Sequence, residues 1–274
     1  MKTLARFVAR SRVDQLIFKA RSWWKAILPR HTFLFTLLIA SLSITGCGTL
    51  LPPSVPDIDL PTAELPGENN LRFVVRGDSG DATATQAAVA AAIQNVCNGL
   101  GGCHFGLLLG DNIYPGGAVN VTDSQFQDKF ENPYMGVDFP FFLVLGNHDY
   151  GGRGAGYEFW KGQVEVDYTD HSTSGNWRMP AHHYRFKVGG GTATVDLFAI
   201  DTNSIFYRNP WAQRWWLRRA LANSDAQWKI VYGHHTYISN GKHGDAGHYE
   251  EGWLPFPAPP IVNGRAVKDF FDQV

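Results

Sequence analysis

From about residue 71 onward, short apolar runs alternate with segments whose apolar residues recur at helical spacing. Such runs predict buried strands where they stop at glycine or polar residues, and apolar residues three to four positions apart predict helices. The predicted strands are Leu71–Arg76, Phe105–Leu109, Phe139–Leu145, Tyr184–Val188, Thr194–Ile200 and Trp228–Tyr232. The predicted helices are Thr83–Val96, Asp123–Phe130, Gln213–Leu221 and Val267–Phe271. Strands that alternate with helices favour an α/β fold with a largely parallel sheet.

Four of the predicted strands end in the same way, with glycine followed by Asp, Asn or His. The four segments are Gly77-Asp78, Gly110-Asp111, Gly146-Asn147-His148 and Gly233-His234. Ligands of open α/β sheets bind beyond the carboxyl ends of the strands, so we expect these polar side chains to gather at one edge. Glycine before each of them lets the backbone turn sharply and approach a bound ion closely. One such segment alone would indicate an ordinary turn, but their recurrence favours a shared metal site.

The first 46 residues differ in charge from the rest of the chain. They hold eight of the 24 basic residues but only one of the 25 acidic residues, so the remainder carries a formal net charge of -8. A body this acidic argues against a nucleic acid as partner, because it would not displace counterions from a polyanion. An excess of carboxylates does suit a site for hard cations.

An apolar run at residues 33–44 follows the basic segment and ends at Thr45-Gly46-Cys47. The run is too short to span a bilayer comfortably and has the length of a signal-peptide core. Small residues before a cysteine resemble a bacterial lipobox. We therefore expect residues 1–47 to be a lipoprotein-type signal sequence with Cys47 acylated, which places the protein in the bacterial cell envelope, either periplasmic or at the cell surface. A plain signal anchor is the alternative.

Residues 48–70 are rich in proline and predict an extended tether that precedes one folded domain at residues 71–274. With Cys47 lipidated, Cys97 and Cys103 remain as a pair six residues apart. An exported chain can keep a disulfide between them, and two buried free thiols are the alternative.

The segments at the strand ends also resemble a known family. Four segments are similar to four of the five ordered motifs of the metallophosphoesterase (calcineurin-like) superfamily, namely Gly77-Asp78-Ser79-Gly80, Gly110-Asp111-Asn112-Ile113-Tyr114, Gly146-Asn147-His148-Asp149 and Gly233-His234. Tyr114, three residues after the second Asp, resembles the purple acid phosphatase branch, which includes the tartrate-resistant acid phosphatases. The resemblance covers about residues 71–274 and implies a layered αββα sandwich.

The resemblance implies a centre of two metal ions. Asp111 would bridge them, Asp78 and Tyr114 would complete one site, and Asn147 and His234 would serve the other. A phenolate is a hard anionic donor, so Tyr114 suggests Fe(III) in the first site, and divalent Fe, Zn or Mn would suit the second. The alternative for Tyr114 is packing at a strand end.

The same resemblance implies two catalytic histidines. His148, as an imidazolium, would stabilise the charge of the transition state or protonate the leaving alkoxide. Asp149 would orient it, or would be an ordinary turn carboxylate. His243 would line the substrate pocket, with a solvated loop residue as the alternative. The role of His235 is open, and we expect four other histidines at the surface or in loops, namely His171, His182, His183 and His248.

The implied activity is hydrolysis of small phosphate monoesters, as in an acid phosphatase, by a hydroxide on the dinuclear centre. A phosphodiesterase or nucleotidase of the same superfamily is the first alternative. A lipoprotein that only binds phosphate or metal, without catalysis, is the second. The family's fifth motif, Gly-His-x-His, does not occur in the sequence. We therefore expect a chain truncated before that motif, with each metal one ligand short and the sandwich incomplete at its C-terminus.

Overall fold

The computed structural model describes residues 57–59, 71–189, 194–208, 210–237 and 265–274. The chain divides into two compact units, Met1–Pro52 and Pro53–Val274, and all described residues belong to the second. The predicted signal sequence with Cys47, most of the tether, and His243 lie outside the described residues. Within the described part, no helix has the length and apolar character needed to cross a membrane.

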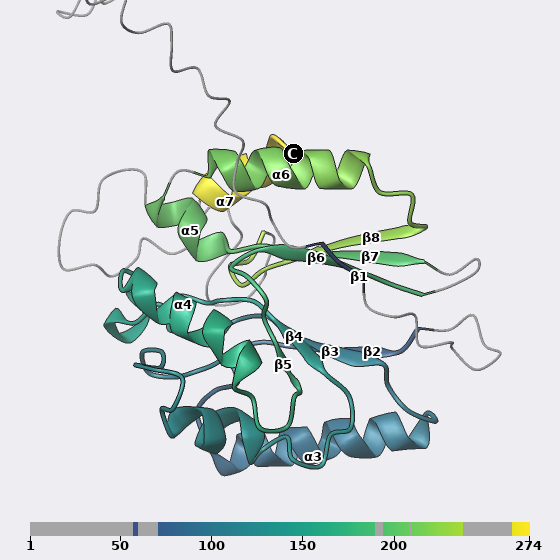
Figure 1. Ribbon diagram of the computed structural model, residues 1–274, viewed down its shortest axis with the longest axis vertical. Helices are drawn as coiled ribbons and strands as arrows, with labels where there is room; N and C mark the ends of the chain where they lie inside the picture. The colour runs from purple at the N-terminus through teal and green to yellow at the C-terminus, as the bar shows by residue number, and fades with distance from the viewer. Residues whose placement is uncertain (1–56, 60–70, 190–193, 209, 238–264) are drawn as a thin grey trace, which may run out of the picture. The chain divides into compact units, whose positions relative to one another are not determined.

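Two four-stranded sheets form the centre of the second unit (Figure 1). The first has the order β2-β3-β4-β5, and its strands are all parallel. They are β2 (Phe73–Arg76), β3 (Phe105–Leu108), β4 (Phe141–Leu143) and β5 (Trp177–Arg178). The second has the order β1-β6-β7-β8, in which only the β6–β7 pair is antiparallel. Its strands are β1 (Asp57–Asp59), β6 (Tyr184–Val188), β7 (Val195–Ala199) and β8 (Trp228–Tyr232).

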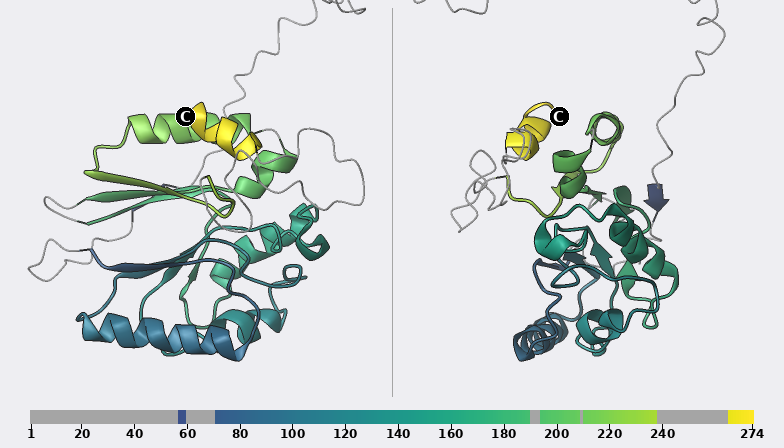
Figure 2. Two further views of the ribbon diagram at one scale, coloured as in Figure 1. Left: turned by 180° about the vertical axis from the view of Figure 1, so that it is seen from behind. Right: turned by 90° about the vertical axis from the view of Figure 1, so that its left-hand side faces the viewer.

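Helices cover the outer faces of the two sheets. The longer helices are α3 (Ala84–Gly99), α4 (Phe159–Asp167), α5 (Thr202–Tyr207), α6 (Trp211–Ala222) and α7 (Arg265–Asp272). Single turns occur at η1 (Gln127–Glu131), η2 (Gly152–Gly154) and η3 (Tyr168–Asp170). Figures 1 and 2 show α3 below the sheet of β2–β5, and α5, α6 and α7 above the sheet of β6–β8. The expected αββα layering is therefore confirmed.

Aromatic side chains fill the space between the two sheets. The ring of Phe186 on β6 stacks on Phe142 of β4 at 4.1 Å and meets the edge of Phe105 on β3 at 5.8 Å. All three side chains are almost fully buried. The hydroxyl of Tyr184 donates to the carbonyl of Leu143 at 2.8 Å, so a hydrogen bond also joins the sheets. Burial of several aromatic rings dominates the stability of such a core.

The structure corrects several expectations about the elements. The predicted strands do not form one largely parallel sheet but are divided between two, and β6 and β7 are antiparallel. The helix expected at Asp123–Phe130 is only the π-helical turn η1. Helix α4 and the short strand β5 were not predicted.

The expected disulfide forms between Cys97, near the end of α3, and Cys103, just before β3. The side chain of Thr83 begins α3 by accepting a hydrogen bond from the backbone of Gln86. The disulfide therefore ties the C-terminal end of this helix to the segment that enters β3, the strand that leads to Asp111.

Candidate metal centre

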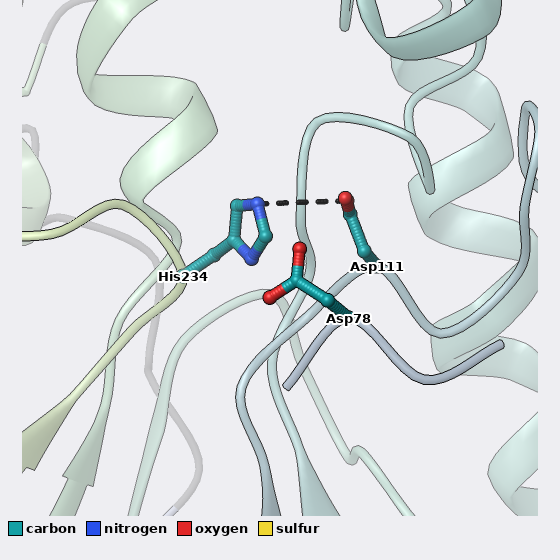
Figure 3. A group of neighbouring side chains, drawn as sticks. All are labelled: Asp78, Asp111 and His234. Carbon is teal, nitrogen blue, oxygen red and sulfur yellow. Dashed lines mark ion pairs between the residues drawn. The ribbon is translucent and has the colours of Figure 1, made fainter. Parts of the chain in front are cut away.

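The predicted ligands meet where strands of both sheets end. Asp78 follows β2, Asp111 follows β3, Asn147 follows β4, and His234 follows β8. One ligand atom each from Asp78, Asp111 and His234 lie within 4.8 Å of one another, and the three side chains point toward one another (Figure 3). Residues distant in the sequence are thus brought to one place, as the strand-end pattern predicts.

The backbone at the two aspartates is in the left-handed conformation. Asp78 and Asp111 both have φ of 54°. Residues other than glycine rarely adopt this backbone conformation, and such strained positions are frequent at functional sites. The turns also pack closely on one another, since a Cβ added to Gly146 would lie 2.2 Å from Oδ1 of Asp111. A Cβ added to Gly110 would lie 2.9 Å from the Cβ of His234.

Tyr114 joins the two aspartates. Its hydroxyl lies 2.7 Å from Oδ2 of Asp111 and 3.0 Å from Oδ1 of Asp78. Burial and then the neighbouring Asp111 raise the pKa of the Tyr114 phenol far above its usual range. The phenol therefore keeps its proton between the two carboxylates, and only a cation at the same place would favour the phenolate.

His234 and Asn147 lie side by side at the centre. Nδ1 of His234 donates to the carbonyl of Leu109 at 2.8 Å, which leaves Nε2 facing the other candidate ligands. Nδ2 of Asn147 donates to the carbonyl of Gly154 at 2.7 Å, which turns Oδ1 toward the ring. Oδ1 of Asn147 lies 2.9 Å from Nε2 of His234, and Oδ1 of Asp111 lies 3.6 Å from the same nitrogen. An imidazole nitrogen, an amide oxygen and a carboxylate oxygen are ligand types that divalent transition metals bind, so the donor set fits a metal ion.

His148 is oriented by a carbonyl and not by Asp149. Nδ1 of His148 donates to the carbonyl of Pro115 at 2.8 Å, and Nε2 lies 4.0 Å from Oδ2 of Asp111. The imidazole ring packs on Tyr114, with 4.4 Å between ring centroids. The hypothesis that Asp149 orients this histidine is therefore wrong.

Asp149 instead joins the turns after β3 and β4. Its fully buried carboxylate accepts hydrogen bonds from the backbone N–H groups of Asn112 at 2.8 Å, Ile113 at 2.9 Å and Gly146 at 2.8 Å. Burial and then the charge of Asp111 raise the pKa of Asp149 to about 7. This carboxylate sets the spacing of the two turns that carry Asp111 and Asn147.

Comparison with known proteins identifies the family of this chain. The family model for calcineurin-like phosphoesterases matches residues 71–262, which is more than half of the chain. The chain belongs to the calcineurin-like phosphoesterase family. Its curated relatives include tartrate-resistant acid phosphatase type 5 from Oryctolagus cuniculus, 30% identical over 199 residues that cover 64% of this chain and 58% of the relative. Purple acid phosphatase 3 from Arabidopsis thaliana is 30% identical over 213 residues, covering 69% of this chain and 54% of the relative.

The chain thus spans 58% of the length of the rabbit relative. A solved structure described as GAP50, the anchor in the inner membrane complex of Plasmodium, has a TM-score of 0.49 and 20% identity. That match covers 73% of this chain and 63% of the Plasmodium chain.

Sequence reasoning missed a hydrogen-bond network that starts at Tyr150, next to Asp149. The hydroxyl of Tyr150 donates to Oδ2 of Asp201 at 2.5 Å and lies 2.7 Å from Nδ1 of His182. His182, expected as a surface or loop residue, is therefore part of the support for the turn after β4. The sequence holds no signal for it, because its partners come from three separate segments.

Two further histidine rings are shielded from solvent, since His235 is buried and His183 is half-buried. His235 lies with Nδ1 2.7 Å from the hydroxyl of Thr202, and burial lowers the pKa of its ring well below the usual range. Burial also lowers the pKa of His183 to about 4, and its ring packs on Trp216. Both rings are therefore neutral at physiological pH and serve as packing or hydrogen-bonding groups.

Glu165 is another buried acid, close to Asp149. It is fully buried, and its Oε1 has no hydrogen-bond partner among the described residues. Burial and then the charge of Asp149 raise the pKa of Glu165 well above its usual value. The folded protein therefore binds a proton here that the unfolded chain releases, so the stability from this proton is lost as pH rises above the unfolded pKa.

We expect Glu165→Gln to flatten the fall of stability with pH, because an amide replaces the protonated acid and does not titrate. Each unit of raised pKa corresponds to about 1.4 kcal/mol. The free energy of unfolding of the variant is therefore expected to rise relative to that of the wild type toward high pH. The measurement is urea unfolding of the metal-free protein from about pH 5 to about pH 8. Asp167→Asn, on an exposed position of the same helix, is the control. Parallel curves for Glu165→Gln and the wild type would rule out a raised pKa at this residue.

Proposed function

We propose that this protein is a metal-dependent phosphatase that hydrolyses small phosphate monoesters. The observation that carries the proposal is the convergence of Asp78, Asp111 and His234 within 4.8 Å at the strand ends of both sheets. Membership of a phosphoesterase family supports the reaction class. The similarity to acid phosphatases supports monoesters, rather than the diesters or nucleotides of the alternative hypothesis.

The resemblance to the purple acid phosphatases supports an assignment of these residues to two metal ions. Asp111 would bridge the ions, with Asp78 and Tyr114 on one side and Asn147 and His234 on the other. Tyr114 favours Fe(III) in the first site, and divalent Fe, Zn or Mn suits the imidazole and amide donors of the second. Such ions, when bound, would neutralise the charge of the phosphoryl group and make water a better nucleophile.

His148 is the general acid of the proposed reaction. Its Nδ1 is engaged by the carbonyl of Pro115, so the proton that it can give away is on Nε2, the nitrogen nearer to Asp111. The side chain is 24% exposed, which leaves room for a substrate beside it. Protonation of the leaving alkoxide by a placed side chain contributes about 10²–10⁴-fold to the rate. His243, the other proposed catalytic histidine, lies outside the described residues.

We also propose that the protein is exported and held at a bacterial membrane through Cys47. The disulfide between Cys97 and Cys103 supports an oxidising compartment, since such bonds persist outside the cytosol. Labelling with a radioactive fatty acid tests the anchor. Label that is lost in Cys47→Ser is expected, and equal labelling of that variant would exclude acylation at Cys47.

The purified protein loaded with iron and zinc is expected to hydrolyse p-nitrophenyl phosphate faster than bis(p-nitrophenyl) phosphate. His148→Ala is expected to lower kcat for the monoester by about 10²-fold or more without changing the metal content. The control is His171→Ala, because His171 is exposed and has no side-chain partner among the described residues. Preference for the diester would favour the phosphodiesterase. Bound metal without any hydrolysis would favour a binding protein.

A further inference from the structure

A loop of unusual backbone conformation follows the turn after β4. Gly151, Gly152, Arg153, Gly154 and Gly156 all have positive φ, between 53° and 91°. Glycine adopts such angles without strain, but arginine does not. Arg153, with φ of 53° and ψ of 44°, is therefore held in place by the residues on either side of it.

Hydrogen bonds fix this loop against the candidate centre. The carbonyl of Gly154 accepts from Nδ2 of Asn147 at 2.7 Å, and the carbonyl of Gly156 accepts from Nδ2 of Asn203 at 3.0 Å. A Cβ added to Gly154 would lie 2.6 Å from Nε2 of His148, so the backbone next to Arg153 touches the proposed general acid.

The other side of Arg153 faces the turn after β3. A Cβ added to Gly116 would lie 3.6 Å from the backbone nitrogen of Arg153. Gly116 follows Tyr114 and Pro115, whose carbonyl orients His148. The Arg153 backbone therefore lies between the turn that carries Tyr114 and the turn that carries His148.

The nearby lysines are engaged, whereas Arg153 is not. Nζ of Lys129 donates to the carbonyl of Tyr114 and to Gln125. Nζ of Lys161 donates to the carbonyl of Gly116 at 2.7 Å and pairs with Glu158 at 3.2 Å. Arg153 is exposed, and its guanidinium makes no hydrogen bond or ion pair with the described residues. Among the described residues, Arg153 is thus a cation with its backbone next to the centre and its guanidinium free to bind an anion.

We propose that Arg153 binds a second anionic group of the substrate, on the side of the leaving alcohol. The proposal rests on the proposed phosphatase function, in which the phosphoryl group lies at Asp111 and the leaving oxygen at His148. Arg153 is bonded to Gly154, whose Cα faces Nε2 of His148, so the arginine side chain leaves the backbone on the side of the alcohol part of the ester. Because a guanidinium recognises carboxylates and phosphates with paired hydrogen bonds, the favoured substrates are monoesters whose alcohol carries a carboxylate or another phosphate.

A matched pair of substrates tests this inference. 3-Phosphoglycerate and glycerol 3-phosphate have the same phosphoryl position, but only the first carries a carboxylate. We expect the wild type to prefer 3-phosphoglycerate. Arg153→Gln is expected to lower kcat/KM for 3-phosphoglycerate about ten- to a hundred-fold, mainly through a higher KM. The kcat/KM for glycerol 3-phosphate is expected to change by less than about three-fold. An equal loss for both substrates, or no preference in the wild type, would overturn the proposal.

A second variant separates binding from a structural role. Glycine suits the left-handed backbone at position 153, so Arg153→Gly is expected to keep or raise the Tm while it loses the preference for 3-phosphoglycerate. A fall in Tm together with equal losses for both substrates would make Arg153 a structural residue.

Calorimetric binding of both compounds to the metal-loaded protein keeps the inference testable without turnover. We expect tighter binding of 3-phosphoglycerate by the wild type and no difference for Arg153→Gln. Selective binding without hydrolysis would contradict the phosphatase function but support the role of Arg153. Hydrolysis without selective binding would support the phosphatase function but contradict the role of Arg153.

Discussion

Asp111→Asn is expected to lower kcat by about 10³-fold or more and to reduce the metal content of the protein. Asp111 lies at the centre of the ligand set, with Oδ2 2.7 Å from the hydroxyl of Tyr114 and Oδ1 3.6 Å from Nε2 of His234. Both oxygens are needed if the side chain bridges two ions, and an amide offers only one. Asparagine also tolerates the left-handed backbone at this position, so the fold is expected to survive.

Metal stoichiometry by elemental analysis and the kinetics of p-nitrophenyl phosphate hydrolysis are the measurements. Asp128→Asn removes an equal charge from an exposed position of the first sheet's helical layer and is the control. A variant that keeps two ions and the wild-type kcat would show that Asp111 does not bridge them. Loss of metal in the control as well would indicate a general effect of charge.

The positions of the candidate ligands could be predicted because each lies at a strand end that the sequence marks clearly. An apolar run that stops at glycine and a polar residue locates Asp78, Asp111 and His234 without knowledge of the sheet order. The strand pattern alone could not show the division into two sheets, since a short buried run has the same pattern in either sheet. Only the family resemblance implied it. Helix α4 was also hidden, because its buried face includes Gly162 and Glu165 rather than an apolar stripe.

The contacts that orient the site could not be read from side-chain types. His148 is held by the carbonyl of Pro115, and every residue carries such a group. The glycine-rich segment that presents Arg153 is adjacent to the third motif in the sequence. Its sequence is typical of an exposed loop, and only the structure shows that the carbonyl of Gly154 accepts a hydrogen bond from Asn147. Tertiary packing decides which backbone groups act as partners, so sequence patterns predicted where the candidate ligands lie better than the contacts that support them.

Asp149 is the support whose loss should damage the fold most. Its carboxylate accepts three backbone hydrogen bonds and a fourth from Nδ2 of Asn112 at 3.0 Å. An amide at this position would direct its own N–H groups at some of these donors. Each buried donor left without an acceptor costs about 1–3 kcal/mol, so Asp149→Asn is expected to lose about 4 kcal/mol of unfolding free energy. That is a large fraction of the stability of an ordinary domain.

Urea unfolding of the metal-free protein at about pH 8 is the measurement, because the carboxylate of Asp149 with its pKa of about 7 is then mostly ionised. Asp138→Asn, at an exposed position, is the control and is expected to change the midpoint little. Since the turns after β3 and β4 are joined through this carboxylate, the variant is also expected to bind metal more weakly wherever it still folds. An unfolding midpoint equal to that of the wild type would mean that the two turns hold their spacing without Asp149. The close packing of Gly146 on Asp111 would then be the contact that sets the geometry of the centre.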